Sequence, residues 1–338
     1  VGGYASPKKS FEIKRGVNLS HWLSQRGENT PSIQDGMSAT DFSRIARAGF
    51  DHVRLPIDEE VLWQENGQKN KEAFSYLHKG IEWALKNDLR VIVDLHIVRS
   101  HYFNAGNEGK KNSLWEKPEA QTHFLALWQD LVQELKGYST SDVAYEIMNE
   151  PTAPNHEDWN KLVEKAYQII RKVEKERVIV IGSNMWQGVD TFQYLKVPQG
   201  DEFILLSCHF YEPFLLSHYQ AGWTELGKYQ GNVHYPGYLV SKDEFDSLSA
   251  DDKKLVARWR TTPWNRETLS AFLSKAKRVA DEKGLNLYCG EFGIYEKAPI
   301  ESALKWYADV ISVFDSLNIA WAKWDYKGGF GIYTSQNQ

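Results

Sequence analysis

Short apolar runs alternate with helical patterns along almost the whole chain, and this alternation leaves few folds open to it. Eight runs have the length of strands, at residues 12–19, 52–57, 90–96, 143–149, 177–183, 203–210, 286–292 and 319–326. Patterns of helical period lie between them, at residues 39–48, 71–87, 118–136, 157–174, 189–194, 266–283 and 301–317. Strands that alternate with helices are typical of a parallel sheet covered by helices.

Eight such units predict an α/β fold of the closed (β/α)8 type, the TIM barrel. Such a barrel usually takes about 250 residues and tolerates insertions, so we expect residues 1–338 to form a single domain. An open doubly wound sheet is the alternative, but it would usually show a glycine-rich turn after the first strand, and none is present. Only residues 327–338 follow the last predicted strand, so the final outer helix should be short or absent.

The composition argues against several classes of protein. No run approaches the roughly 18 apolar residues of a membrane span, so we expect none. The net charge of −5 and the lack of a basic block make nucleic acid an unexpected partner. Thirteen Trp and 17 Tyr fit either a large core or a set of flat platforms for a ligand such as a sugar ring or a base.

The two cysteines, Cys208 and Cys289, are expected to be free thiols. In alternating strands Cys208 points away from its neighbour His209, and Cys289 points the same way as Glu291. If His209 and Glu291 both face the barrel mouth, the two sulfurs lie on opposite faces of the sheet. The cysteines therefore do not indicate a compartment, and no signal peptide is recognisable.

Polar and aromatic residues gather where the predicted strands end, which is the active face of such barrels. Several have a structural alternative. Arg54 could neutralise a buried acid such as Glu146, His96 could be a core hydrogen-bonding group beside Asp94, and Trp324 could belong to the core. The residues at these ends include Asn18, Arg54, His96, Asn149, Glu150, Asn184, Trp186, His209, Tyr211, Glu291 and Trp324.

Two glutamates stand out among these residues. Glu150 follows Asn149 and precedes Pro151 after the fourth predicted strand, and Glu291 lies in the seventh. A pair of carboxylates at strand ends is what a retaining glycosidase needs, because one protonates the leaving oxygen while the other attacks the sugar carbon. Their carboxyl groups should then lie about 5–5.5 Å apart. Neither a metal nor an organic cofactor is expected, because the two carboxylates can perform the whole reaction.

The chain resembles glycoside hydrolase family 5, the cellulase family, whose catalytic acids lie on strands four and seven. The resemblance extends over nearly the whole chain, and the order of the motifs makes it specific. The motifs are Arg15-Gly-Val-Asn-Leu19, Ile147-Met-Asn-Glu-Pro151, Cys208-His-Phe-Tyr211, Gly290-Glu-Phe-Gly293 and Trp324-Asp-Tyr-Lys-Gly328. The resemblance implies that residues 1–338 are a single glycoside hydrolase catalytic domain.

The resemblance also implies a role for each residue at the strand ends. Glu150 would be the acid/base and Glu291 the nucleophile, while Asn149 would bind the hydroxyl next to the reacting carbon. Arg54 and Tyr211 would contact the nucleophile. His96 and His209 would line the site, and Trp324 would form the floor where the bond breaks. Residues 97–101 depart from the family, since many relatives have a second His and a Gly there.

We therefore expect a retaining endo-β-1,4-glucanase that acts on polysaccharide or oligosaccharide. Mannan, xyloglucan, mixed-linkage glucan or a small glucoside are alternative substrates, and a non-catalytic carbohydrate-binding barrel is the alternative of another class.

The predicted connection from residue 211 to about residue 263 carries Trp223 and Trp259, and we expect Trp223 at least to line the leaving-group side of the cleft. A loop that packs on itself is the other interpretation. The enzyme should be a monomer that is secreted, periplasmic or on the cell surface.

Overall fold

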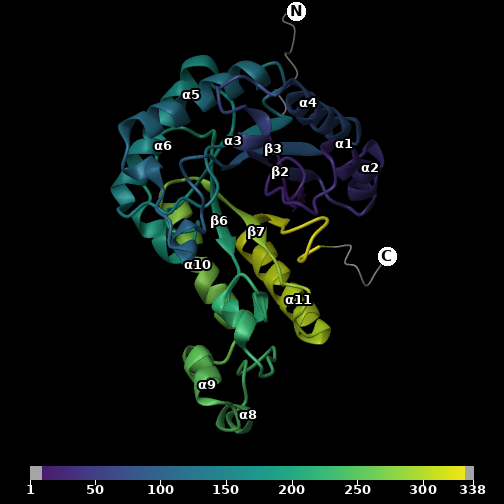
Figure 1. Ribbon diagram of the computed structural model, residues 1–338, viewed down its shortest axis with the longest axis vertical. Coiled ribbons are helices and arrows are strands. Elements are labelled where there is room, and N and C mark those ends of the chain that lie inside the picture. The colour runs from purple at the N-terminus through teal and green to yellow at the C-terminus, as the bar shows by residue number, and fades with distance from the viewer. Residues whose placement is uncertain (1–9, 332–338) are drawn as a thin grey trace, which may run out of the picture.

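The computed structural model describes residues 10–331 (Figure 1). Its strands form a closed parallel barrel in the order β1 to β8. This confirms the (β/α)8 prediction. The strand bounds are β1 Arg15–Asn18, β2 His52–Asp58, β3 Arg90–Ile97, β4 Val143–Glu146, β5 Ile179–Gly182, β6 Ile204–Phe210, β7 Asn286–Phe292 and β8 Ala320–Lys323.

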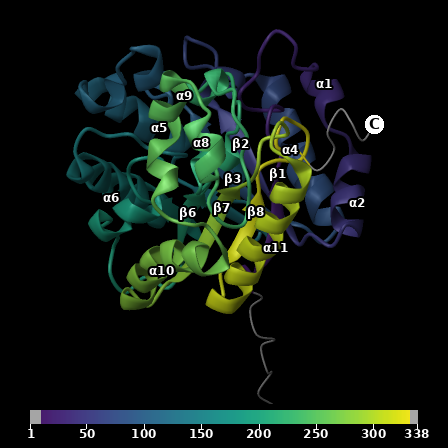
Figure 2. The ribbon, with the colours of Figure 1, turned by 90° about the horizontal axis from the view of Figure 1, so that it is seen from below.

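Long helices surround the strands on the outside of the barrel (Figure 2). They are α2 Ala39–Arg47, α4 Lys71–Lys86, α5 Pro118–Leu135, α6 His156–Val173, α10 Arg266–Glu282 and α11 Ile300–Leu317. Shorter helices lie in the connections: α1 Ile33–Gly36, α3 Glu59–Leu62, α7 Phe214–Ser217, α8 Lys242–Asp246 and α9 Ala250–Val256, with 3-10 turns η1 Ala105–Glu108, η2 Ser113–Trp115, η3 Val189–Tyr194, η4 Glu225–Lys228 and η5 Ala257–Arg260. None of the helices in residues 10–331 is both long and apolar enough to cross a membrane.

Helix α4 illustrates how the local sequence specifies these elements. Asn70 caps its first turn, because the side-chain oxygen accepts a hydrogen bond from the amide of Ala73 at 3.1 Å. Its apolar residues recur at helical spacing, so that Phe74, Leu77 and Ile81 are buried on one face. The barrel strands are apolar on both faces, because helices cover their outer face and the strands pack against one another inside the barrel.

The inside of the barrel contains a small apolar core with a polar layer at the carboxyl end of the strands. The apolar part is a cluster of Ile92, Ala144, Val180, Tyr288 and Ala322. Asp94 and Glu146 follow Ile92 and Ala144 by two positions, so their side chains lie on the same face of the sheet. The fold therefore places polar side chains at the mouth of the barrel.

The two cysteines are free and buried, as expected, but the prediction that their sulfurs lie on opposite faces is wrong. Cys208 pairs with Cys289 across β6 and β7, whereas His209 pairs with Glu291, so that Gly290 is an extra residue in β7. This bulge interrupts the alternation on which the prediction rested. Both side chains pack in the core outside the barrel, where the thiol of Cys289 donates to Glu291 O at 3.2 Å.

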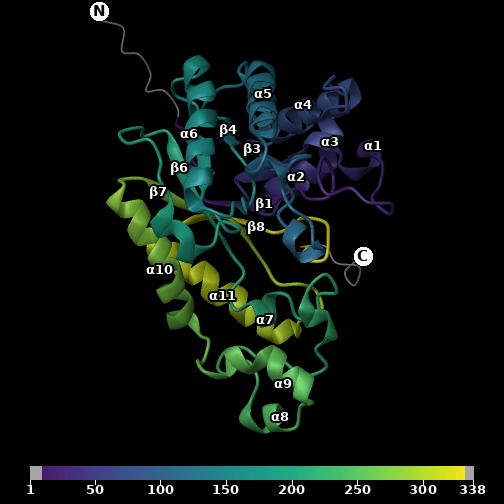
Figure 3. The same ribbon diagram turned by 60° about the vertical axis from the view of Figure 1, so that its left-hand side comes forward.

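The connection between β6 and α10 is partly structured, as its length suggested. It contains α7, η4, α8, α9 and η5, and its tip with α8 and α9 lies away from the barrel (Figures 1 and 3). Tyr235 attaches it to α11 through a 2.6 Å hydrogen bond from its hydroxyl to Asp309 Oδ2. After β8, residues 324–331 form no helix, and residues 332–338 lie outside the described part of the chain.

Candidate active site

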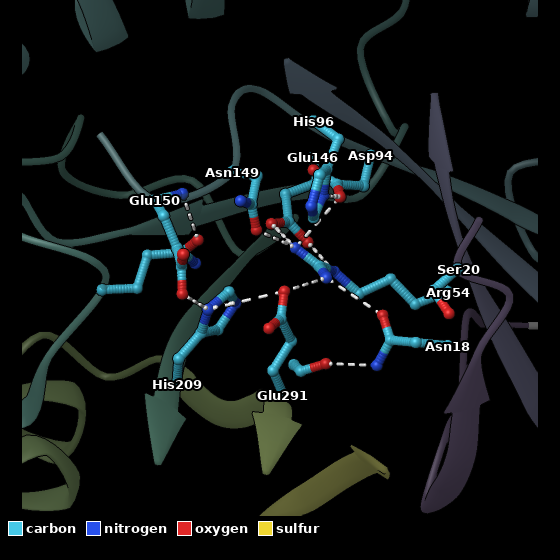
Figure 4. Close-up of polar contacts among 12 residues, drawn as sticks. Asn18, Ser20, Arg54, Asp94, His96, Glu146, Asn149, Glu150, His209 and Glu291 are labelled. Carbon is cyan, nitrogen blue, oxygen red and sulfur yellow. Dashed lines mark hydrogen bonds and ion pairs between the residues drawn. The ribbon is translucent and has the colours of Figure 1, made fainter. Parts of the chain in front are cut away.

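Polar side chains from β1, β2, β3, β4, β6 and β7 and the loops that follow them meet at the mouth of the barrel (Figure 4). The two glutamates singled out in the sequence are among them. Oxygens of Glu150 and Glu291 and a ring nitrogen of His209 all lie within 4.8 Å of one another. His209 Nδ1 is 2.9 Å from Glu150 Oε1 and 3.6 Å from Glu291 Oε2. The fold thus brings together two carboxylates that are far apart in the sequence.

Two donors hold the carboxylate of Glu291. Arg54 Nη1 donates to Glu291 Oε2 at 2.7 Å, and the hydroxyl of Tyr211 donates to Oε1 at 2.8 Å. Burial and the charge of Glu291 raise the pKa of Tyr211 well above its usual range, so that the phenol keeps its proton and acts as a donor. Both oxygens of Glu291 therefore accept hydrogen bonds that favour its ionised form.

Arg54 is fully buried and contacts several acids at once. Its Nε and Nη2 donate to the two oxygens of Glu146 at 2.9 and 2.7 Å, and Nη2 lies 3.1 Å from Asp94 Oδ2. The amide oxygens of Asn18 and Asn149 accept from Nη1 and Nη2 at 3.0 and 2.9 Å. The structural alternative for Arg54 is therefore confirmed, and the same guanidinium also reaches Glu291.

The environment separates the proton affinities of the two glutamates. Burial, followed by the nearby charge of Glu291, raises the pKa of Glu150 well above its usual range. Burial also raises the pKa of Glu291, but the charge of Arg54 and the bond from Tyr211 oppose that rise. Two carboxylates this close disfavour double ionisation, so that a shared proton resides on Glu150 while Glu291 is charged.

The two histidines of the site are neutral. Burial and the charge of Arg54 lower the pKa of His96 to about 3 and that of His209 well below its usual range. Their contacts with Asp94 at 2.6 Å and with Glu150 at 2.9 Å are therefore hydrogen bonds of neutral imidazoles, although the distances are also those of ion pairs. The core interpretation of His96 is confirmed by its bond to Asp94, and His96 also lines the cleft.

A cleft of about 2150 Å³ opens over these residues and continues along the segment that follows β6. Trp324 lies against His96, with ring planes 7° apart and centroids 5.7 Å apart, and it lines the cleft although it is only 8% exposed. Trp223 also lines the cleft and is 51% exposed. Trp259 lines it too but is mostly buried, so Trp223 has much the larger free surface.

Sequence reasoning missed Gln187, a buried residue whose side chain accepts a hydrogen bond from the amide of Glu150 at 2.9 Å. A glutamine in a loop carries no signal of such a role. Trp186 was noted at the end of the fifth strand but was not included among the site residues. It is 44% exposed and lines the cleft.

One group among residues 10–331 has the geometry of a metal site, and it consists of Glu150, His209 and Glu291. Arg54 already places a positive charge 2.7 Å from a Glu291 oxygen, which opposes a second cation there. The same oxygens and nitrogen suit the hydroxyl groups and the reacting carbon of a sugar. The site is therefore better matched to an uncharged, hydroxyl-rich ligand than to an ion.

Comparison with known proteins agrees with a site for a hydroxyl-rich ligand such as a sugar. The sequence model of Cellulase (glycosyl hydrolase family 5) matches residues 14–329. Endoglucanase C of Acetivibrio thermocellus is 31% identical over 332 residues, covering 96% of this chain and 95% of the relative. Cellodextrinase A of Ruminococcus flavefaciens is 28% identical and covers 92% of this chain and 85% of the relative.

The chain is also similar to solved enzyme structures. Thermotoga maritima Cel5A in complex with mannotriose has a TM-score of 0.76 and 26% identity, covering 96% of this chain and 94% of that one. A mutant form of the same enzyme with cellobiose has a TM-score of 0.76 and 26% identity as well. With the family match over nearly its whole length, the chain belongs to glycosyl hydrolase family 5, the cellulase family, and is a glycoside hydrolase.

Proposed function

We propose that this chain, as one catalytic domain, is a retaining endo-β-1,4-glucanase in which Glu291 is the nucleophile and Glu150 the acid/base. The observation that carries the proposal is the approach of Glu150 and Glu291 oxygens to within 4.8 Å. Retaining enzymes have carboxyl groups about 5–5.5 Å apart, whereas inverting enzymes leave about 6.5–9.5 Å for a water molecule.

The reaction then proceeds in two displacements. Glu291 attacks the anomeric carbon while Glu150 gives its proton to the leaving oxygen, so that the glycosidic bond breaks and a glycosyl–enzyme bond forms. Glu150, now a carboxylate, takes a proton from water, whose oxygen attacks the same carbon and releases Glu291. Arg54 and Tyr211 keep Glu291 ionised and directed toward the sugar, and their bonds re-form when the carboxylate is released.

The other site residues would bind the sugar. Asn149 would hold the hydroxyl beside the reacting carbon, since its amide oxygen already contacts Arg54 and its Nδ2 has no protein partner. His96 and His209 are neutral and line the site. Trp324 would form the floor where the bond breaks, and Trp223 would stack on a sugar of the leaving-group side.

Glucan is the proposed substrate because relatives named endoglucanase match almost the whole chain. Mannan is a second candidate, because Thermotoga maritima Cel5A has been crystallised with mannotriose.

Polymeric glucan cannot enter a cell, so we propose that the enzyme acts outside the cytoplasm. We also propose that it acts as a monomer, since one chain carries the complete site.

The experiment is a substrate screen combined with product stereochemistry. Purified protein is incubated with carboxymethylcellulose, lichenan, xyloglucan and mannan, and the release of reducing ends is measured. We expect the highest rate on a β-1,4-glucan, and NMR of the first product should show the β-anomer before mutarotation. An α-anomer would overturn the retaining mechanism. Binding to these polymers with no release of reducing ends would instead support a non-catalytic barrel.

A further inference from the structure

Glu150 has an unusual backbone for the end of a strand. Its φ is +44°, in the left-handed region, which a non-glycine residue adopts only at some cost. The strand β4 ends at Glu146, so the amide of Glu150 lies beyond it. That N–H donates to Gln187 Oε1 at 2.9 Å. A side chain 37 positions away therefore satisfies the main chain of the proposed acid.

Gln187 is also bonded to His209, the residue that contacts Glu150. Its backbone carbonyl accepts a hydrogen bond from the amide of His209 at 2.9 Å. His209 Nδ1 in turn lies 2.9 Å from Glu150 Oε1. Three hydrogen bonds thus close a ring through Gln187, Glu150 and His209. Figure 4 shows the contact between Glu150 and His209. Because Gln187 is bonded to both main chains, its position sets where Glu150 and His209 lie relative to each other.

The turn that carries Gln187 is strained. Met185, Trp186 and Gln187 have φ values of +55°, +59° and +56°, three consecutive non-glycine residues in the left-handed region. Each such residue costs on the order of 1–3 kcal/mol, and strain of this kind clusters at active sites. The amide of Trp186 donates to Pro151 O at 3.2 Å, which ties the turn to the residue after Glu150.

The Gln187 side chain occupies space that is free because residue 182 is a glycine. A Cβ at Gly182, the last residue of β5, would lie 2.2 Å from Gln187 Nε2. The orientation of the amide follows from chemistry, since only its oxygen can accept from the N–H of Glu150. Gln187 itself has 0% exposure. A completely buried side chain in a strained turn, with space cleared for it, is typical of a residue that holds others in place.

From this ring of hydrogen bonds we infer that Gln187 is a positioning residue for the acid/base Glu150. The inference rests on the proposed role of Glu150. Gln187 does not touch the reacting atoms. It fixes the main chain of Glu150 and of His209, so that the carboxyl proton of Glu150 is directed toward the leaving oxygen. An uncharged amide does this without adding a charge to a site that already contains two carboxylates.

The test compares two cellobiosides with different leaving groups. Phenol is a poor leaving group and needs the proton from the acid, whereas 2,4-dinitrophenolate leaves without it. We expect Gln187→Met to lower kcat/KM for the phenyl cellobioside about 10- to 100-fold, because a displacement near 1 Å can reduce catalysis to this extent. The value for the dinitrophenyl cellobioside should change less than about threefold, since its first step needs no general acid.

Controls separate positioning from general damage. Active sites are counted by the burst of dinitrophenolate from a 2-deoxy-2-fluoro cellobioside, and rates are expressed per labelled site. Gln187→Asn keeps a buried amide but is one methylene shorter, so it should show the same selective loss and carries the test if the Met variant folds poorly. Gln193→Met, which changes an exposed glutamine on η3, should leave both substrates unaffected.

The outcomes are distinct. An equal loss on both substrates in the Gln187 variants, or no loss on either, would overturn the inference. Glu150→Gln is measured in parallel, and it must itself lose far more on the phenyl than on the dinitrophenyl substrate. If it does not, the acid assignment fails, and the role of Gln187 fails with it.

Discussion

Arg54 determines the charge balance of the site, because it is a single buried cation among three acids. Asp94, Glu146 and Glu291 all lie within ion-pair distance of its guanidinium. One positive charge cannot neutralise three carboxylates. Burial raises the pKa of Asp94 to about 6 and that of Glu146 to about 7. Burial thus disfavours full ionisation of Asp94 and Glu146, and of the three acids only Glu291 lines the cleft.

The proton of Glu150 should limit activity at high pH. Its pKa is raised by burial and by Glu291, and activity needs the protonated form, so kcat/KM should fall as pH rises through that pKa. Glu150→Gln cannot titrate, so its profile with an activated aryl cellobioside should lack the alkaline limb that the wild type shows with the phenyl cellobioside. The measurement is kcat/KM from pH 4 to about 10. A limb at the same pH in the variant would assign the acid to another group.

Loss of the nucleophile should be rescued by a small anion. Glu291→Ala keeps Asn149 and Glu150, so we expect turnover to fall by several orders of magnitude while substrate binding is largely kept. Azide can occupy the space of the lost carboxylate and attack from that side, giving a glycosyl azide of inverted configuration.

Glu150→Ala is the matched control for the azide experiment. Here azide would attack the glycosyl enzyme instead, and the product should retain its configuration. NMR of both products decides between the two roles. A product of retained configuration from the Glu291 variant, or near-normal turnover without azide, would mean that the nucleophile is a different residue.

At the level of elements, the strand ends supply the catalytic groups and the segment after β6 supplies one wall of the cleft. Trp223 packs edge-on against Tyr295, with ring centroids 4.8 Å apart, and next to Phe330 at 6.2 Å. Tyr211, which donates to Glu291, also packs against Phe330 at 6.0 Å. The aromatic wall is thus continuous from Trp223 to the catalytic end of the cleft.

Removing the free ring of this wall should affect long substrates selectively. Trp223→Ala is expected to lower kcat/KM for a soluble glucan about tenfold, because a lost aromatic contact of about 1.4 kcal/mol corresponds to that factor. Aryl cellobiosides place only an aryl ring on the leaving-group side, so they should lose much less than the long substrate.

Tyr238→Ala is the matched control, since Tyr238 is 47% exposed in the same segment but does not line the cleft. It should leave both substrates unaffected. Comparable losses on long and short substrates in the Trp223 variant would favour a loop that merely packs on itself.

At the scale of the whole molecule, buried acids make the stability of the fold depend on pH. Asp58, at the end of β2, is 1% exposed, and burial raises its pKa from 3.8 to about 7. The folded state therefore holds this proton more tightly than the unfolded state does. The resulting stabilisation is complete below pH 3.8 and is lost as pH rises toward about 7.

Asp58→Asn tests this dependence because an amide does not titrate. Relative to the wild type, the variant should gain more than about 1 kcal/mol of unfolding free energy between pH 5 and pH 8, since each unit of pKa difference is worth about 1.4 kcal/mol. Urea unfolding at the two pH values measures it. Asp243→Asn on α8 replaces an exposed carboxylate and should show no such gain. An unchanged difference for the Asp58 variant would refute the prediction.

Periodicity in the sequence was sufficient to predict the barrel and the region of its site. Strand and helix periods are local properties, and parallel strands in a closed barrel bring all their carboxyl ends to one face. Glu150, Glu291, Arg54 and Tyr211 could therefore be grouped from their places at strand ends alone. The helix predicted at residues 71–87 is α4, Lys71–Lys86, because helical period and capping are local properties of the sequence.

Register and long-range packing were decided only by the tertiary structure. The extra residue Gly290 shifts β7 by one position and puts both cysteines on the same face, which no period of two can foretell. Gln187 meets the amide of Glu150 only because a strained turn folds back over β5. The reason is physical: local pattern specifies which way a side chain faces, but contacts between distant residues depend on the path of every intervening loop and on the space that neighbouring side chains leave.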